Sequence, residues 1–237
     1  MLINLLSHYA SRLKGGDYQI DTRLDLTDVI SLVRRRLAMK TRGYIRFPFR
    51  GHRPFIGSGV RIRARGRIKF GGSLTIDDGA FIDATSVNGV RLGHNVSLGR
   101  NSRIECTGNI QNLGTGFCAG DNVGLGTDNL FGSAGGIKIG RETIIGNYCS
   151  FHSENHNTSD IKTPIRMQGV TRQGIEIGED CWIGSRVTIL DGVTTGRGCI
   201  FAAGSVVRSG YYEDFGIYAG VPAKLVRFRD GENGNAA

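Results

Sequence analysis

The chain has 237 residues, with 37 glycines against 4 prolines and a formal net charge of +9. The glycines lack the triplet repeat of collagen, and no apolar run approaches the ~20 residues that cross a bilayer, so neither a collagen-like chain nor a transmembrane span is predicted. The positive charge favours an anionic partner: nucleic acid, a phosphorylated cofactor, an acidic saccharide or a membrane surface.

The first fifty residues carry no repeat. Residues 1–6 lack a basic leader and a cleavage site, so we expect a cytoplasmic protein. Residues 27–40 read as a helix that Asp25 or Thr27 can cap and Gly43 can end. Its expected apolar stripe consists of Val29, Val33 and Leu37, with Ile30 beside it.

An arginine run, Arg34 to Arg36, is expected to face away from that stripe. The simpler interpretation is a solvated face on a helix that packs against an open end of the following domain. The alternative is peripheral contact with a membrane surface or an anionic polymer, which basic amphipathic helices can make.

The clearest repeat runs from Ile177 to Val207, where one pattern returns every six residues: IGEDCW, IGSRVT, ILDGVT, TGRGCI and FAAGSV. A period of six fits neither a helix of 3.6 residues per turn nor an alternating strand. It fits a chain that turns a corner every six residues, so that three hexads close one triangular coil with the first residue of each hexad inside. Glycine at the second or fourth position allows the turn where a Cβ would clash.

Shorter runs of the same pattern begin upstream, at Ile56, Ile76, Leu92, Leu113 and Ile139. Slips of a few residues separate them, and we expect these to be small bulges or loops at corners. The region has room for about seven coils of eighteen residues. The predicted fold is therefore all-β, a parallel β-helix over residues 51–210, with a helical cap segment at 1–50 and a C-terminal extension at 211–237.

One segment, residues 152–174, has polar residues, a proline and no hexad phase. It must leave the coil as a long loop, and loops of this length are usually functional or disordered. It contains His152 and His156, two of the five histidines. After Val207 the chain is expected to leave the repeat, and the polar tail from residue 230 is expected to fray.

The five cysteines form no close C-x-x-C pair. Cys149, Cys181 and Cys199 fall on the fifth position of their hexads, which favours small side chains. We interpret them as buried core residues of a protein in a reducing compartment.

Four segments resemble the hexapeptide-repeat acyltransferases: SENHNTSD, CWIGSRVTILDGVTTGRG, FAAGSVV and AGVPAKLVR. The resemblance covers residues 56–229 and is greatest to the sugar and polysaccharide O-acetyltransferases. It implies a left-handed β-helix, a homotrimer, and acetyl-CoA as co-substrate in a groove between subunits. No metal and no nucleic acid are implied, and residues 1–50 are not covered.

The resemblance also implies roles for individual residues. His156 stands where the family has its catalytic base, with His152, four residues earlier, as the alternative base. Trp182 stands where the family has a tryptophan that packs by the thioester. The expected acetyl-CoA contacts are Ser185, Ala203 and Gly204 along the pantetheine arm, with Lys224 and Arg227 at the nucleotide phosphates. Arg186 is a further candidate for a phosphate.

Transfer of an acetyl group from a thioester to a hydroxyl requires a general base and a hydrogen-bond donor, which these residue types can supply. A sugar hydroxyl must lose its proton as it attacks a thioester, and a neutral imidazole with an ordinary pKa near 6.5 can take that proton. The oxyanion of the intermediate needs an N–H donor, from a coil amide or from the Trp182 indole. Direct transfer is expected in preference to a covalent intermediate on Cys149 or Cys181.

Three other functions remain open. One is N-acetylation of an amino-sugar nucleotide or a small amine. Another is a zinc site like that of the γ-class carbonic anhydrases, for which His94, His152 and His156 would be the ligands. The third is a solenoid that only binds a polymer. The acceptor is expected to be a capsular, exopolysaccharide or lipopolysaccharide-type saccharide, or a sugar nucleotide.

Overall fold

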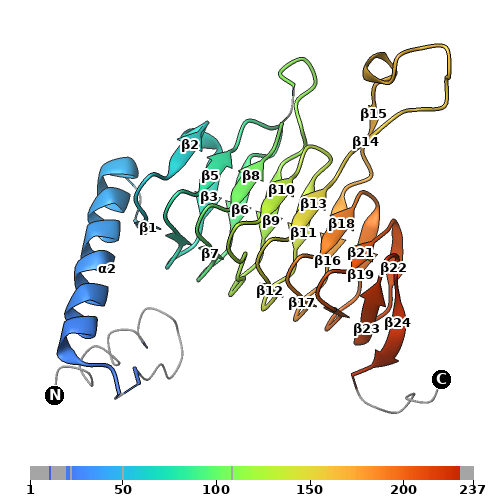
Figure 1. The fold of residues 1–237 in the computed structure, drawn as a ribbon. Coiled ribbons are helices and arrows are strands. Elements are labelled where there is room, and N and C mark those ends of the chain that lie inside the picture. Colours follow the sequence, from blue (N-terminus) through green and yellow to red (C-terminus); the bar gives the residue numbers. More distant parts are fainter. Residues whose placement is uncertain (1–10, 12–19, 22, 50, 108, 230–237) are drawn as a thin grey trace.

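The computed structural model describes residues 11, 20, 21, 23–49, 51–107 and 109–229. The first six residues and the tail from residue 230, about which the sequence made predictions, lie outside these ranges. Figure 1 shows helix α2 (Leu26–Arg46) standing against one end of a long stack of coils. Within the described ranges, no helix is long and apolar enough to cross a membrane.

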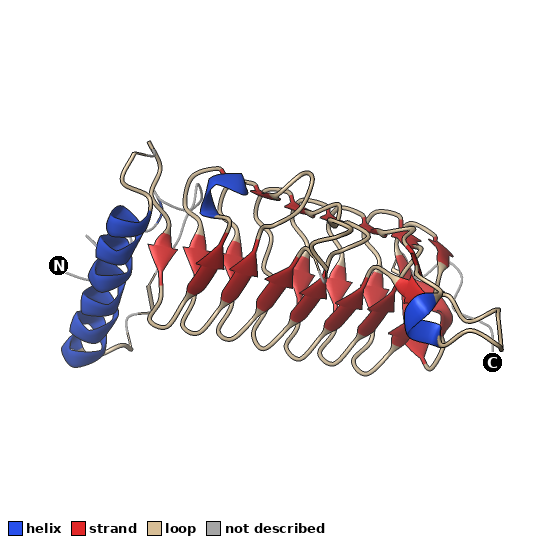
Figure 2. Cartoon of the chain, turned by 90° about the horizontal axis from the view of Figure 1, so that it is seen from above, coloured by secondary structure: helices blue, strands red, loops and turns tan. Residues whose placement is uncertain are grey.

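The coils are triangular, and their three sides form sheets A, B and C, in which each strand pairs in parallel with the strand one coil away (Figure 2). Sheet A comprises β1 (Phe55–Ile56), β4 (Thr75–Ile76), β7 (Ser97–Leu98), β12 (Ile144–Ile145), β17 (Trp182–Ile183), β20 (Ile200–Phe201) and β23 (Gly216–Gly220). Bridges through Gly124 join β7 to β12.

Sheet B comprises β2 (Arg61–Arg63), β5 (Phe81–Asp83), β8 (Arg103–Glu105), β10 (Leu130–Gly132), β13 (Ser150–His152), β18 (Thr188–Leu190) and β21 (Val206–Val207). Sheet C comprises β3 (Ile68–Phe70), β6 (Val90–Leu92), β9 (Phe117–Ala119), β11 (Ile137–Ile139), β16 (Ile175–Ile177), β19 (Val193–Thr195) and β22 (Gly210–Tyr212). The prediction of a left-handed parallel β-helix of about seven coils is confirmed, since sheets B and C each have seven strands.

The slips between hexad runs all fall at one corner. Four residues link each strand of sheet A to the following strand of sheet B, as in 57–60, 99–102 and 184–187. The links from sheet C to sheet A also have four residues, except the last, 213–215. The links from sheet B to sheet C vary from two residues (191–192) to twenty-two (153–174). One edge of the prism, the B–C edge, therefore carries every insertion.

The interior consists of the first residues of the hexads, as the pattern predicts. Ile56, Ile82, Leu98, Ile189 and Phe201 are completely buried. Leu113 is an exception, because it belongs to the insertion at 106–116 and is exposed. The hexad phase at that coil begins instead at Ala119, which is buried.

Glycines and left-handed residues shape the corners for two different reasons. In the five hexads that begin at Ile177, the fourth residue has φ between +55° and +80°, as at Asp180, Arg186 and Gly204. The second residue must be small for a steric reason. A Cβ on Gly184 would lie 2.7 Å from the amide nitrogen of Ala203 in the next coil.

Helix α2 is longer than predicted, and the predicted stripe is confirmed only at its start, where Val29 is buried and Val33 is half-buried. It begins after Asp25, whose side chain accepts a hydrogen bond from the Asp28 amide, and continues past Gly43 to Arg46. Gly43 and Met39 are buried against the first coil, whereas Leu37 is 59% exposed. The helix therefore does not end at Gly43. Residue 43 is glycine because the helix touches Pro54 there, and a Cβ would overlap the Pro54 carbonyl oxygen.

The arginine run faces the coil in part, contrary to the predicted solvated face. The Arg35 guanidinium pairs with both Asp77 and Asp78, at 2.9 Å from the latter. Arg36 lies over the Phe55 ring, 5.3 Å from its centroid. Both arginines share the helix face of Met39, and they contact the first two coils while their side chains remain exposed to water.

The coil also continues past Val207, where the sequence pattern appeared to stop. Strand β22 pairs in parallel with β19, and β23 with β20. Tyr212 and Tyr218 replace aliphatic residues inside and pack on Phe201, with ring centroids 5.3 and 5.4 Å from it. Strand β24 (Ala223–Phe228) then folds back antiparallel on β23.

Candidate functional site

His156 lies on a short ladder that projects from the B–C edge. Strand β14 (Asn155–His156) pairs antiparallel with β15 (Val170–Thr171), and His156 faces Val170 in the register. The side chain is exposed. The loop at 153–174 thus has regular structure that the sequence did not predict, and it holds the imidazole outside the coil.

Hydrogen bonds order the tip of this loop beyond the ladder. The Gln168 side-chain amide donates to the carbonyl oxygens of Asp160 and Thr163, at 2.8 and 2.7 Å. The Asp160 carboxyl accepts a hydrogen bond from the Thr163 hydroxyl at 2.6 Å, and this bond, together with one from the Lys162 amide, lowers the pKa of the carboxyl. A 3-10 turn (Ile165–Met167) completes the tip.

A buried carboxylate holds the base of the loop. Asp191 is 2% exposed and accepts hydrogen bonds from the amides of Gln173, at 3.0 Å, and Gly174, at 2.7 Å. Its other oxygen lies 3.5 Å from the side-chain nitrogen of Asn155, the residue before His156. Both stems of the loop are therefore tied to one side chain in the next coil.

Arg172 connects the loop to the insertion of an earlier coil. It pairs with Glu154 at 3.0 Å and donates to the carbonyl oxygen of Leu113 at 3.2 Å. Its side chain is only 20% exposed. The two longest insertions on the B–C edge thus support each other.

Trp182 points outward from sheet A, as its position in the hexad predicts, and is 52% exposed. Its neighbours in the ladder are Ile144 and Ile200, and Ile144 is 55% exposed. Tyr148, which is also exposed, follows at the next corner. These four residues form an apolar patch on sheet A that water does not favour.

The residues expected along the pantetheine arm gather at the edge between sheets A and B. Ser185, Ala203 and Gly204 are exposed there in two successive coils. The Gly204 amide donates to the Ser185 carbonyl at 2.9 Å, and open space lies where a Gly204 Cβ would stand. Arg186 lies over the Tyr148 ring at 6.0 Å.

Lys224 and Arg227 lie on β24, at the end of sheet A, and both are exposed. Lys224 faces Ala219 in the β23–β24 register and Arg227 faces Ile217. All five predicted acetyl-CoA contacts therefore lie on sheet A or its border with sheet B.

His156 does not join this group within one chain. Its loop stands on the B–C edge, and in a triangular coil that edge is opposite sheet A, where Trp182 lies. Figure 1 shows the two on opposite sides of the stack, with β14 and β15 above it and β12 and β17 below. The structure thus separates the predicted base from the predicted tryptophan.

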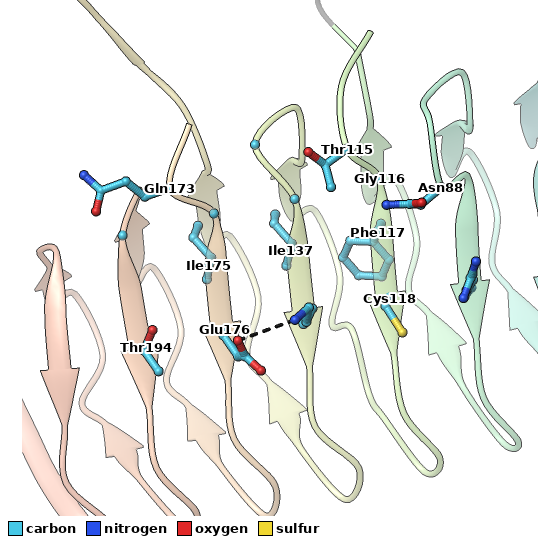
Figure 3. Close-up of a pocket in the computed structure, with 16 residues that line it drawn as sticks. Asn88, Thr115, Gly116, Phe117, Cys118, Ile137, Gln173, Ile175, Glu176 and Thr194 are labelled. Carbon is cyan, nitrogen blue, oxygen red and sulfur yellow. Dashed lines mark ion pairs between the residues drawn. The ribbon is translucent and has the colours of Figure 1, made fainter. Parts of the chain in front are cut away.

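A groove of about 490 Å³ crosses the outer face of sheet C at the base of the loop (Figure 3). Its rim, along the B–C edge, includes Thr115, Gln173 and five glycines: Gly116, Gly135, Gly136, Gly174 and Gly192. Its floor carries one outward side chain from each strand, in the order Arg91, Cys118, Lys138, Glu176 and Thr194. We call this feature the sheet C groove. None of the predicted site residues lines it.

The cysteines expected in the core are buried there: Cys149, Cys181 and Cys199 are at most 2% exposed. Burial raises the pKa of the Cys149 thiol. The pKa of the Cys199 thiol is also raised, mainly by its hydrogen bond with Cys181 and then by burial. Cys118, by contrast, is exposed in the sheet C groove.

The three histidines of the zinc alternative lie at different places. His94 stands on a corner between sheets C and A, His152 ends β13 in sheet B, and His156 lies on the loop. Across the residues that the structure describes, no three histidine, cysteine or acidic side chains gather closely enough to hold a metal ion.

Sequence reasoning missed three features of this region: Asp191, the exposed Ile144 and Tyr148, and the sheet C groove. The signal for Asp191 was present, because an acidic residue in ILDGVT occupies the coil directly after the loop. The groove had no local signal, since its floor residues are 18 to 38 positions apart in neighbouring strands and meet only through the sheet register.

Comparison with known proteins adds sequence relatives. Residues 174–209 match the family described as bacterial transferase hexapeptide (six repeats). An Escherichia coli protein named as a lipopolysaccharide biosynthesis O-acetyl transferase, WbbJ, is 30% identical over 145 residues, which cover 58% of this chain and 71% of WbbJ. A Mycobacterium tuberculosis protein named as an acetyltransferase is 40% identical over 110 residues, 46% of this chain. That match spans 36% of the length of the mycobacterial relative.

Solved structures show the same fold. A variant of the Bacillus cereus N-acyltransferase AntD, in complex with dTDP-4-amino-4,6-dideoxyglucose and coenzyme A, has a TM-score of 0.50 and 18% identity, covering 76% of this chain and 82% of its own. A second Bacillus cereus protein, described as an acetyltransferase, has a TM-score of 0.50 and 20% identity, covering 74% and 87%.

Proposed function

Because the chain belongs to the hexapeptide-repeat transferase family, we propose that it transfers an acetyl group from acetyl-CoA to a hydroxyl group of a saccharide. The observation that carries the proposal is the exposed His156 on a braced two-stranded projection. WbbJ, which is named for O-acetyl transfer in lipopolysaccharide biosynthesis, supports the choice of a saccharide hydroxyl over an amine.

In the proposed reaction, His156 takes the proton of the acceptor hydroxyl as the hydroxyl oxygen attacks the thioester carbon. The carbon–oxygen bond forms, the carbon–sulfur bond then breaks, and the imidazolium returns its proton to the departing thiolate of CoA. The negative oxygen of the intermediate needs an N–H donor, for which the Trp182 indole and the coil amides are candidates. No acyl-cysteine is invoked, since the Cys149 and Cys181 thiols are buried.

The site is proposed to form between copies of the chain in a homotrimer. Since His156 and Trp182 lie on opposite sides of one coil, they can meet only if the loop of one copy reaches sheet A of the next. Sheet C of the first copy would then border the same cleft. The apolar patch around Trp182 would be covered in this arrangement.

Acetyl-CoA is proposed to lie along the edge between sheets A and B. Exposed backbone at Ser185, Ala203 and Gly204 would border the pantetheine arm, and Lys224 and Arg227 would meet the phosphates at the end of sheet A. The resemblance to family members motivates these assignments, and their grouping on one side of the coil is compatible with a single extended ligand.

Substitution of the base tests the proposal. We expect His156→Ala to lower kcat for acetyl transfer about 10²- to 10⁴-fold, the usual contribution of a general base, and to leave acetyl-CoA binding unchanged by calorimetry. His152→Ala serves as the control, because His152 ends a coil strand below the loop. Near wild-type kcat in His156→Ala would refute the assigned base.

The acceptor can be identified by mass spectrometry. The full-length protein would be incubated with acetyl-CoA and, separately, with capsule-type oligosaccharides, amino-sugar nucleotides and small amines. A mass gain of one acetyl group on an oligosaccharide hydroxyl is the expected result. Transfer only to an amine would replace the proposed function with N-acetylation.

A further inference from the structure

The floor of the sheet C groove carries a row of charged and polar side chains that the proposed function leaves unused. Within the groove the row follows the strand register, so that Arg91 faces Cys118 and Cys118 faces Lys138. Lys69 faces Arg91 from β3, one strand beyond the lining of the groove, and extends the row. Glu176 and Thr194 continue it. All these side chains are exposed.

Positive charge dominates one half of this row. Lys138 and Glu176 form an ion pair at 3.6 Å and neutralise each other (Figure 3). Lys69 and Arg91 stand in the two preceding strands with only Cys118 between them and Lys138. The uncompensated charge of the groove therefore lies towards the N-terminal coils, where a negatively charged group would be attracted.

The dimensions of the row suit an extended ligand. Neighbouring strands of a sheet are about 4.8 Å apart, so the four steps from Lys69 to Glu176 span about 19 Å. Five glycines along the rim carry no side chains that could project over the groove. The backbones there also pack closely, since a Cβ on Gly174 would lie 3.1 Å from the Gly135 carbonyl oxygen. Thr115 and Gln173 on the rim offer a hydroxyl and an amide to sugar hydroxyls.

The groove also borders the C-terminal stem of the loop that carries His156, where an acceptor would have to lie. Gln173 and Gly174, which follow β15 after Arg172, belong to the rim of the groove, and their amides are also the ones that Asp191 holds at the foot of the loop. A ligand in the groove would therefore lie beside the projection that carries His156, on the sheet that would border the intersubunit cleft.

We propose that the sheet C groove binds the saccharide acceptor, and that this acceptor carries a carboxylate or phosphate group that Lys69 and Arg91 recognise. The inference rests on the proposed function. It assigns the half of the row with Glu176, Gln173 and Thr194 to neutral sugar hydroxyls, and the half with Lys69 and Arg91 to the anionic group.

Binding can be measured without acetyl transfer. The full-length protein would be titrated by calorimetry with an oligogalacturonate, which carries carboxylates, with UDP-glucose, which carries a diphosphate, and with the neutral maltohexaose. The test variant is Lys69→Gln/Arg91→Gln. The matched control is Arg34→Gln/Arg100→Gln, which removes the same charge from exposed positions outside the groove.

We expect one of the two anionic probes to bind the wild type more tightly than maltohexaose does, with an affinity that falls as salt is added. The test variant should weaken that binding roughly tenfold or more, because two charge-assisted contacts are lost. The control should bind as the wild type does, and thermal unfolding of both variants should match it. Which probe responds identifies the anionic group as carboxylate or phosphate.

Equal weakening in the test and control variants would overturn the proposal, since net charge alone would then explain binding. It would also be overturned if neither anionic probe bound, or if vesicles of anionic lipid bound instead with the same dependence on Lys69 and Arg91. These outcomes are independent of the His156→Ala result. A failed binding test leaves the general base in place, and a failed base test leaves the anion site in place.

Discussion

Asp191 places a negative charge where a charge is costly unless hydrogen bonds surround it. Burial of an unpaired carboxylate is strongly unfavourable, so the amides of Gln173 and Gly174 stabilise the carboxylate as much as it orders them. Because Asn155 also contacts it, the position of His156 relative to the coil depends on this one side chain. We regard Asp191 as a positioning residue for the proposed base.

We expect Asp191→Ala to lower kcat for acetyl transfer roughly tenfold or more and to leave the Kd of acetyl-CoA unchanged, because two loop amides lose their acceptor. Amide exchange at Gln173 and Gly174 should accelerate, and Asp191→Asn, which keeps one oxygen, should restore part of both properties. Wild-type kcat in Asp191→Ala would contradict the positioning role. Lost acetyl-CoA binding would show that the coil itself was damaged.

Individual functional residues could be predicted from the sequence only where they belong to a recognisable motif. His156 and Trp182 could be selected because the surrounding letters resemble a family, and the outward direction of Trp182 followed from the hexad alone. The sequence does place an acidic residue, Asp191, directly after the loop, but it does not reveal that this residue is buried, because a polar residue at the third position of a hexad ordinarily faces water. Only the three-dimensional contact with the stems of the loop reveals its burial.

Helix α2 shows how a docking surface alters the interpretation of a sequence. Its apolar residues predicted one stripe, yet the face that packs contains Met39 and Gly43 together with arginines. Arg42 donates to the Ile56 carbonyl at 3.3 Å and Arg46 to the Val60 carbonyl at 2.8 Å. The end of a β-helix exposes unpaired backbone oxygens, and arginines satisfy them where aliphatic side chains could not.

The ion pairs of Arg35 make this docking sensitive to acid. The hydrogen bond from Arg35 lowers the pKa of the Asp78 carboxyl below its ordinary value of 3.8. A carboxyl whose pKa is lower in the folded state stabilises the fold above the unfolded pKa and loses that effect as pH falls through the folded pKa. The stabilisation should therefore be complete at neutral pH and decline below about pH 4.

Denaturant unfolding from pH 7 to pH 3 can check this expectation. At pH 7, Arg35→Gln should lower the free energy of unfolding by about 1 kcal/mol or less, since the pair is half exposed. The difference from the wild type should shrink as pH falls towards 3. Arg34→Gln, one position away on the helix, is the matched control, and a difference that persisted at pH 3 would count against the ion pair.

The architecture of the whole molecule could be predicted from the sequence more completely than its individual residues or elements. A six-residue period repeated over 150 positions reports on the interior, which is the same in every coil, so the coil number and the parallel sheets followed directly. The continuation of the coil into β22 and β23 escaped prediction because Tyr212 and Tyr218 stand where the pattern expects aliphatic residues. The orientation of the face of helix α2 escaped because it depends on contacts with another part of the chain.

A shared site in a trimer makes a quantitative prediction for mixed subunits. If acetyl transfer requires both side chains, the His156→Ala and Trp182→Ala variants should each be nearly inactive when assembled alone. After joint refolding at equal amounts, three quarters of random trimers would contain both variants, and each would have one intact site of three. Activity should then return to about a quarter of the wild type. No recovery, despite mixed trimers by native mass spectrometry, would place both residues in the same subunit.

The concentration of insertions on the B–C edge has a consequence for how this chain can vary. Inside and outside alternate along every strand, so one extra residue at the four-residue links around sheet A would turn later side chains inside out. The B–C edge escapes this rule, because its links already range from two residues to twenty-two. It is where foreign segments could be grafted, and where a new recognition loop could be acquired while the scaffold stays unchanged.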